Sequence, residues 1–167
     1  MIANGGISRR TRRAALVGVA ALFLILTNDR AGAAAAAEPW GEWLVADKMA
    51  RIRVADCASV LWGIISWEAD PGVDSKNPDP TLRARPTTGT PILLAMKPAG
   101  PQRWDGSIYN PQNGKFYSGG VTMISTDSLR VRGCILGFLC GGENWTRVTA
   151  AALEPDAAIC ARLGPAR

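Results

Sequence analysis

The chain has 167 residues and a formal net charge of +5, with 19 Lys and Arg, 14 Asp and Glu and no histidine. The absence of histidine excludes Ser-His-Asp and Cys-His nucleophiles and any metal site built on imidazole. Five of the basic residues and one acid precede residue 38, which leaves 14 basic and 13 acidic residues in the remaining 130. A clustered basic face is therefore not expected, and neither is a nucleic-acid partner.

Residues 1–37 have the organisation of a secretory signal peptide. Arginines at 9–13 precede an uncharged apolar run over 14–26, and small residues follow over 31–37. These are the basic, apolar and cleavage regions of an export signal. The apolar run is shorter than the roughly 20 residues that cross a bilayer, so we expect cleavage and no stable membrane span. The sequence predicts a periplasmic or secreted domain that begins at Glu38, and an uncleaved N-terminal anchor is the alternative.

The chain after the leader consists of short segments with β periodicity, separated by glycine and proline. Charged and apolar residues alternate over 51–54, for example, as expected of a half-buried strand. The expected strands span 41–45, 51–54, 60–67, 91–96, 104–108, 117–124, 129–132 and 144–148. About eight short strands joined by turns predict an all-β sandwich or barrel over residues 38–150. Residues 151–167 are expected to form a short helix or a tail.

Residues 68–90 interrupt this pattern with a long, polar, proline-rich connection, and loops of this length are commonly functional. Its candidate site residues are Asp70, Asp74, Asn77, Asp79, Arg83 and Arg85. Carboxylates bind calcium or transfer protons, and arginines bind carboxylate or phosphate groups. In the alternative interpretation the Asn and Asp side chains cap turns and an arginine pairs with an acid. The spacing does not match an EF-hand loop, and the sequence assigns no catalytic residue, metal ligand or cofactor.

An ordered series of motifs runs through most of the chain after the leader. It comprises Gly41-x-Trp43, Asn77-Pro78-Asp79-Pro80, Leu82-Arg83-x-Arg85-Pro86-x-x-Gly89, Trp104-x-Gly106-x-Ile108-Tyr109-Asn110-Pro111-x-x-Gly114-Lys115-x-Tyr117, Arg132-Gly133-Cys134 and Cys140-Gly141-Gly142-x-x-Trp145-Thr146-Arg147. In these motifs the chain resembles an exported bacterial family known as domain of unknown function 2147. The resemblance implies a lipocalin-like antiparallel β-barrel and no established biochemical activity.

The resemblance also implies how such a barrel closes. In lipocalin-like barrels a Gly-x-Trp in the first strand packs against an arginine of the last strand, and Trp43 and Arg147 occupy these positions. Such a contact combines cation–π attraction with burial of the indole.

The four cysteines are expected to form disulfides in an oxidising compartment. Relatives usually carry a second cysteine shortly after the first, where this chain has Trp62. We therefore expect Cys57 to pair with Cys160, in the C-terminal segment, and Cys134 to pair with Cys140. Free or intermolecular thiols are the alternative for the first pair.

The apolar loop between Cys134 and Cys140 contains Ile135, Leu136, Phe138 and Leu139. We expect it to fold back over the mouth of the barrel. The alternative is an outward patch that contacts a ligand, a membrane or a protein partner.

A barrel of about eight strands indicates binding rather than catalysis, because its interior holds side chains or one small ligand. The predicted lining residues are Ile52, Val54, Trp104, Ile108, Tyr117, Val121, Met123, Leu129 and Val131. The expected partner is a small hydrophobic ligand or an envelope protein. One alternative is a packed structural or assembly protein of the cell envelope, in which these residues are simply core. A second is an enzyme or calcium site on the 68–90 connection.

Overall fold

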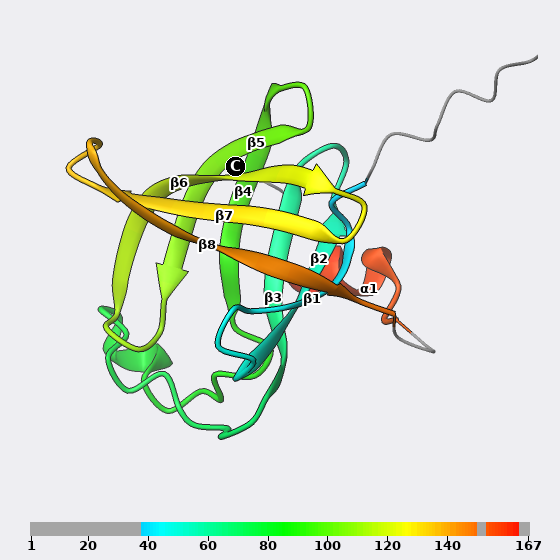
Figure 1. Cartoon of the computed structure of the whole chain (residues 1–167). Helices are drawn as coiled ribbons and strands as arrows, with labels where there is room; N and C mark the ends of the chain where they lie inside the picture. Colours follow the sequence, from blue (N-terminus) through cyan, green and yellow to red (C-terminus); the bar gives the residue numbers. More distant parts are fainter. Residues whose placement is uncertain (1–37, 150–152, 164–167) are drawn as a thin grey trace, which may run out of the picture. The chain divides into compact units, whose positions relative to one another are not determined.

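The computed structural model describes residues 38–149 and 153–163 (Figure 1). The leader expected over residues 1–37 lies outside the described residues, as do parts of the expected C-terminal tail. The described elements are β1 (Gly41–Leu44), β2 (Ala50–Asp56), β3 (Leu61–Glu68), the 3-10 helix η1 (Pro80–Leu82), β4 (Pro91–Gly100), β5 (Arg103–Asn110), β6 (Lys115–Ser125), β7 (Ser128–Ile135), β8 (Leu139–Val148) and the helix α1 (Asp156–Leu163).

The strands form the predicted antiparallel barrel, and it is closed. Each strand pairs with the next along the chain, and β1 also pairs with β8, where Trp43 lies opposite Arg147. Closure removes the free edges that would otherwise invite pairing with another chain. The β1–β2, β3–β4, β5–β6 and β7–β8 connections share one end of the barrel, which we call the mouth. The other connections share the opposite end, the base.

Alternation of side chains across the strands produces the core. On β7, Leu129 and Val131 are buried inside the barrel, whereas Arg130 and Arg132, which alternate with them, are exposed outside. Inward apolar residues from around the barrel meet in one cluster, whose buried members are Trp43, Ile52, Val54, Leu61, Ile65, Ile92, Leu93, Met96, Val121, Met123, Leu129, Val131 and Trp145.

The base is closed by Trp43 and Arg147. The Trp43 ring is fully buried, its Nε1 donates a hydrogen bond to the Pro39 carbonyl at 2.7 Å, and the Arg147 guanidinium carbon lies 4.2 Å from the ring centroid. Arg147 also donates to the carbonyls of Trp40, at 2.9 Å, and Thr126, at 2.5 Å. One side chain thus ties the segment before β1 to the β6–β7 turn.

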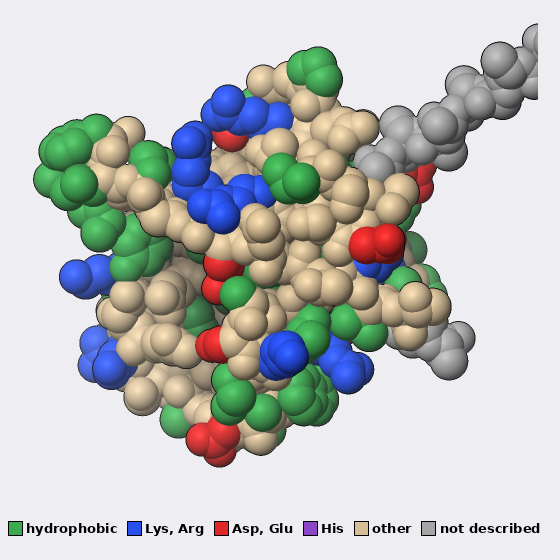
Figure 2. All heavy atoms as spheres, viewed as in Figure 1, with side chains coloured by type: hydrophobic (Ala, Val, Ile, Leu, Met, Phe, Trp, Pro, Cys, Tyr) green, Lys and Arg blue, Asp and Glu red, His purple; other side chains and the backbone are tan. Residues whose placement is uncertain are grey.

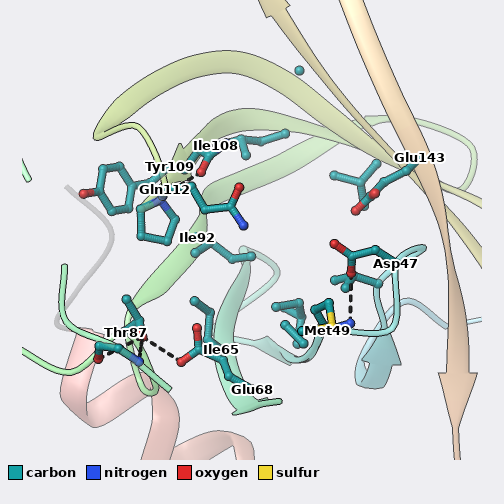
Figure 3. A pocket seen from close by; sticks show the side chains of 18 of the residues that line it. Asp47, Met49, Ile65, Glu68, Thr87, Ile92, Ile108, Tyr109, Gln112 and Glu143 are labelled. Carbon is teal, nitrogen blue, oxygen red and sulfur yellow. Dashed lines mark hydrogen bonds between the residues drawn. The ribbon is translucent and has the colours of Figure 1, made fainter. Parts of the chain in front are cut away.

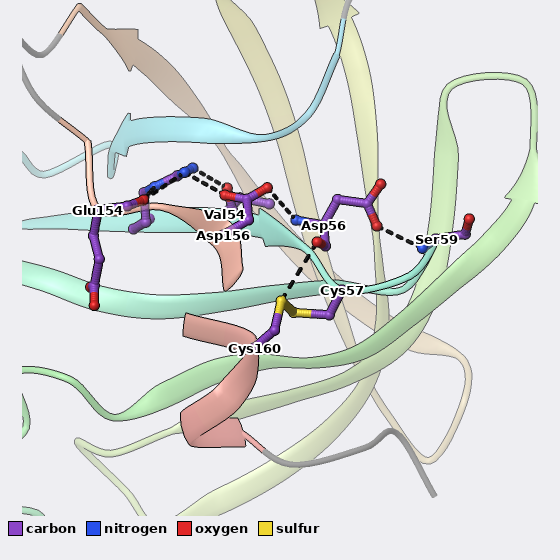
Figure 4. The surroundings of a disulfide bond; sticks show 8 residues. Val54, Asp56, Cys57, Ser59, Glu154, Asp156 and Cys160 are labelled. Atoms are coloured by element: carbon purple, nitrogen blue, oxygen red, sulfur yellow. Dashed lines mark hydrogen bonds and ion pairs between the residues drawn. A yellow bond between two sulfur atoms is a disulfide. The ribbon is translucent and has the colours of Figure 1, made fainter. Parts of the chain in front are cut away.

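Helix α1 packs on the outer face of β2 and β3, where Ile159 contacts Ala55 and Ile64. It begins at Asp156, directly after Pro155, whose fixed φ is compatible with the start of a helix. Asp156 accepts a hydrogen bond from Arg53 on β2 at 2.5 Å, and its other carboxylate oxygen accepts one from the Asp56 backbone N–H at 3.0 Å (Figure 4).

Both expected disulfides are formed. Cys57, just after β2, is bonded to Cys160 in α1 (Figure 4). Cys134 is bonded to Cys140 across the β7–β8 hairpin. Two disulfides are compatible with an exported protein. Among the described residues, no helix has the length and apolar character needed to cross a bilayer.

Candidate ligand-binding site

The mouth of the barrel contains a cavity of about 690 Å³ (Figure 3). Residues of three connections at this end line it: Asp47 from β1–β2, Lys76 from β3–β4 and Gln112 from β5–β6. Strands β7 and β8 of the last hairpin add Gly133 and Gly142. The antiparallel order of the strands brings these distant segments together.

The floor of the cavity is apolar. Its aliphatic side chains come from strands around the barrel and are Ile52, Ile65, Ile92, Ile108 and Val131, with Trp145 beside them. Ile52 is 1% exposed and belongs also to the core cluster, so the cavity floor is the upper surface of the packed core. The interior is therefore filled toward the base and open toward the mouth.

Seven of the nine predicted lining residues lie in one of these two regions. Ile52, Ile108 and Val131 line the cavity. Four others belong to the core cluster and are not part of the cavity lining: Val54, Val121, Met123 and Leu129. Alternation identified the inward face correctly, but the height of a residue along the barrel depends on strand register, which composition does not reveal.

Trp104 and Tyr117 also lie outside the cavity lining. Trp104 is partly buried and packs against the core cluster. The hydroxyl of Tyr117 accepts a hydrogen bond from the Asn113 side chain at 2.8 Å, so it is engaged by the β5–β6 turn.

The rim of the cavity is acidic. Its charged lining residues are Asp47, Glu68, Asp70 and Glu143, against the single cation Lys76. Glu143 accepts a hydrogen bond from Trp145 Nε1 at 2.5 Å. Glu68 accepts from the Thr87 hydroxyl at 2.7 Å (Figure 3) and from the Thr88 hydroxyl at 2.8 Å. These contacts orient the carboxylates of Glu68 and Glu143. Four carboxylates against one ammonium group give the rim a net negative charge, which favours cations and hydrogen-bond donors.

Most of this rim was not predicted from the sequence. Asp47 and Glu143 are 96 residues apart, in a turn and in a strand, and neither position carries a recognisable motif. Only the closed register of the barrel brings them to the same opening. Asp70 was expected at a site, although together with the other acids of the 68–90 connection.

The other acidic candidates of this connection, Asp74 and Asp79, do not line the cavity. Asp74 is fully buried outside the cavity lining, where its carboxylate accepts hydrogen bonds from Tyr109 Oη at 2.5 Å, Asn77 at 2.7 Å and Arg85 at 2.8 Å. Burial alone would raise the pKa of Asp74, but the hydrogen bonds from Tyr109, Asn77 and Arg85 outweigh it and lower that pKa. Burial and the same Asp74 contact raise the pKa of Tyr109 to about 12.

The remaining candidates fix the loop itself. Asn77 Oδ1 accepts from the Asp79 backbone, and Asp79 caps η1 by accepting from Thr81 N, both at 2.9 Å. Arg83 donates to the Asn77 carbonyl at 2.8 Å. Asp70, Asp74 and Asp79 therefore do not converge, and within the described residues no three acids or cysteines are grouped as metal ligands would be. The contacts correspond to the structural interpretation of this connection.

Comparison with known proteins agrees with this architecture. The model of the family described as "Uncharacterized protein conserved in bacteria (DUF2147)" matches residues 41–147. The solved structure of protein HP1028 from Helicobacter pylori, which its title assigns to the lipocalin family, is similar with a TM-score of 0.61 and 20% identity. The match covers 67% of this chain and 84% of that chain, and at this identity it shows the lipocalin-like fold alone. No curated protein matches the chain.

Proposed function

The chain belongs to the bacterial DUF2147 family, and we propose that it binds one small, largely apolar molecule in the mouth of its barrel. The observation that carries this proposal is the cavity of about 690 Å³ above an aliphatic floor. Pockets for small organic ligands usually have volumes of about 300–1,000 Å³ and mostly apolar walls. The cavity lies within that range, and burial of an apolar ligand against its floor would supply the binding free energy.

The charges of the cavity rim restrict the chemical class of the ligand. Four carboxylates and one ammonium group surround the opening, so an anionic end group would meet like charges. A hydrogen-bond donor or a cation would instead meet acceptors that are already oriented, such as Glu68 and Glu143. We therefore propose a ligand with an apolar body and a neutral or positively charged polar end.

We further propose that binding takes place outside the cytoplasm, after export directed by the leader over residues 1–37. The two disulfides support this location, since such bonds persist in oxidising compartments.

The test uses protein purified after export. Native mass spectrometry reports co-purifying small molecules, and the neutral fluorescent probe N-phenyl-1-naphthylamine reports the free cavity. Replacing Ile108→Trp places an indole in the cavity, and we expect probe affinity to fall by at least about tenfold.

Ile124→Trp is the matched control, because Ile124 is 59% exposed on β6 and lies outside the cavity lining. It should bind the probe as the unmodified protein does. Equal affinity in the Ile108→Trp variant, or no saturable probe binding to the ligand-free protein, would reject the proposed site.

A further inference from the structure

The end of the β7–β8 hairpin extends beyond the last residue of β7 that pairs with the neighbouring strand β6. β7 pairs with β8 as far as Ile135 opposite Leu139, whereas its last pair with β6 is Cys134 opposite Ser118. We call residues 135–139 the hairpin tip, and Figure 1 shows it projecting from the barrel.

The tip does not fold back over the mouth, which corrects the expectation from the sequence. Its four large apolar side chains are exposed by 53% at Ile135, 80% at Leu136, 72% at Phe138 and 60% at Leu139. They form a hydrophobic cluster at one extremity of the molecule (Figure 2). The strands run on through Cys134 and Cys140, and the disulfide between these directly opposed residues holds the hairpin extended.

Neither the fold nor the backbone accounts for the leucine at position 136. Its φ of 55° lies in the left-handed region, which leucine seldom adopts and where hairpin turns favour glycine or asparagine. The Leu136 side chain is mostly exposed, so burial does not offset this unfavourable backbone conformation. Four such residues within five positions exceed what a solvent-facing surface ordinarily carries, and a cluster of this kind marks a contact with something outside the chain.

The outer face of the same hairpin is basic. Arg130 and Arg132 are exposed there, and the residues opposite them on β8 are the neutral Asn144 and Gly142. Glu143, the acid of this hairpin, has the opposite orientation and lines the cavity. Arg132 precedes Leu136 by four residues, which is about 13 Å along an extended strand.

We propose that the hairpin tip docks the protein on an anionic lipid bilayer. The apolar side chains of residues 135–139 enter the boundary between headgroups and acyl chains, and Arg130 and Arg132 contact lipid phosphates. Interfacial segments bury their apolar faces to a depth of about 5–10 Å, and at that depth the long Arg132 side chain reaches the phosphate layer. Basic residues near an anionic surface add electrostatic attraction.

Docking in this way places the cavity next to the bilayer, because the tip and the mouth share one end of the barrel. The rim acids Asp47, Glu68 and Asp70 belong to other connections, so insertion of the tip alone leaves them in water. The docking surface is separate from the cavity lining and does not depend on the proposed ligand.

The test is flotation of protein purified after export with vesicles of phosphatidylcholine, with and without phosphatidylglycerol. We expect binding to the vesicles that contain phosphatidylglycerol. The double change Leu136→Ser with Phe138→Ser should lower the partition coefficient by at least about tenfold. Arg130→Gln with Arg132→Gln should lower it by roughly tenfold on anionic vesicles only.

Ile124→Ser is the matched control, because it removes an apolar side chain that is 59% exposed on β6, away from the tip, and should leave flotation unchanged. Thermal melting checks that each variant is folded, and N-phenyl-1-naphthylamine binding checks the cavity independently. The proposal is overturned if the unmodified protein does not float, or if the tip variant floats equally well. Concentration-dependent association in sedimentation, abolished by the tip change without any vesicle binding, would instead identify the tip as a contact between copies.

Discussion

The two ends of the barrel differ in how their side chains are held. At the base, Trp43 is fully buried beneath the Arg147 guanidinium, and a disulfide fastens α1 to the chain after β2. At the mouth, the barrel encloses a cavity, and the long β3–β4 connection is held by hydrogen bonds around Asp74. Apolar packing is therefore the main interaction at the base, and hydrogen bonds are the main interaction at the mouth.

This difference indicates that the two ends of the domain have different roles, stability at the base and binding at the mouth. A core that is filled toward the base stabilises the closed barrel, so the mouth can remain hollow without loss of the fold. Substitutions at the base should therefore lower global stability, whereas substitutions at the mouth should act locally or on binding.

The largest effect is expected from Trp43→Ala. Loss of a fully buried indole from a packed core lowers the free energy of unfolding by about 3–5 kcal/mol, and Arg147 loses its cation–π partner as well. Chemical denaturation measures this change. Trp67→Ala is the control, because Trp67 is 41% exposed on β3, and it should cost much less. Similar losses for the two variants would contradict the packing assigned to the base.

The next effect is expected from removal of the disulfide at the base. The Cys57–Cys160 bond closes a loop of 103 residues, and in the chain-entropy model a loop of about 100 residues is worth about 4.7 kcal/mol. Measured losses on removing native disulfides are about 2–5 kcal/mol. We expect the paired change Cys57→Ala with Cys160→Ala to fall in that range in urea denaturation.

The second disulfide supplies the comparison. Cys134 and Cys140 are six residues apart, so their bond restricts the unfolded chain much less. Changing both to alanine should cost less than changing the base pair, and it should loosen the hairpin tip. A larger loss from the tip pair would show that the mouth contributes more to global stability than its packing implies.

Much of the fold was predictable because strand periodicity and turn residues are local properties. The alternation of Leu129 and Val131 with Arg130 and Arg132 is visible in the sequence and is found on β7. The height of a residue within the barrel is not local, which is why Val54 was grouped with Ile52 although only Ile52 reaches the cavity. Residues 135–139 lack alternation altogether, so the continuation of the β7–β8 ladder to Ile135 and Leu139 was not foreseen.

The smallest of these effects is expected from Tyr109→Phe, which tests the polar network at the mouth. The change removes the hydroxyl that donates to Asp74 Oδ1 and leaves a buried carboxylate oxygen without this partner. Such a loss costs about 1–3 kcal/mol. Because the network holds a connection rather than the core, amide hydrogen exchange should accelerate chiefly in residues 72–87 and much less in β6 and β7.

The same network predicts a dependence on pH. The pKa of Tyr109 is raised in the folded state from an ordinary 10.0 to about 12, so its contribution to stability is complete below pH 10. It is lost as the pH rises from 10 toward 12, where the folded phenol ionises. The pKa of Asp74 is lowered, so its contribution is present above its ordinary value of 3.8 and disappears as the pH falls through the folded value. Unfolding free energies measured against pH should therefore decline at both extremes in the unmodified protein. The alkaline decline should be shallower in the Tyr109→Phe variant, and an unchanged alkaline slope would contradict the role assigned to the Tyr109–Asp74 hydrogen bond.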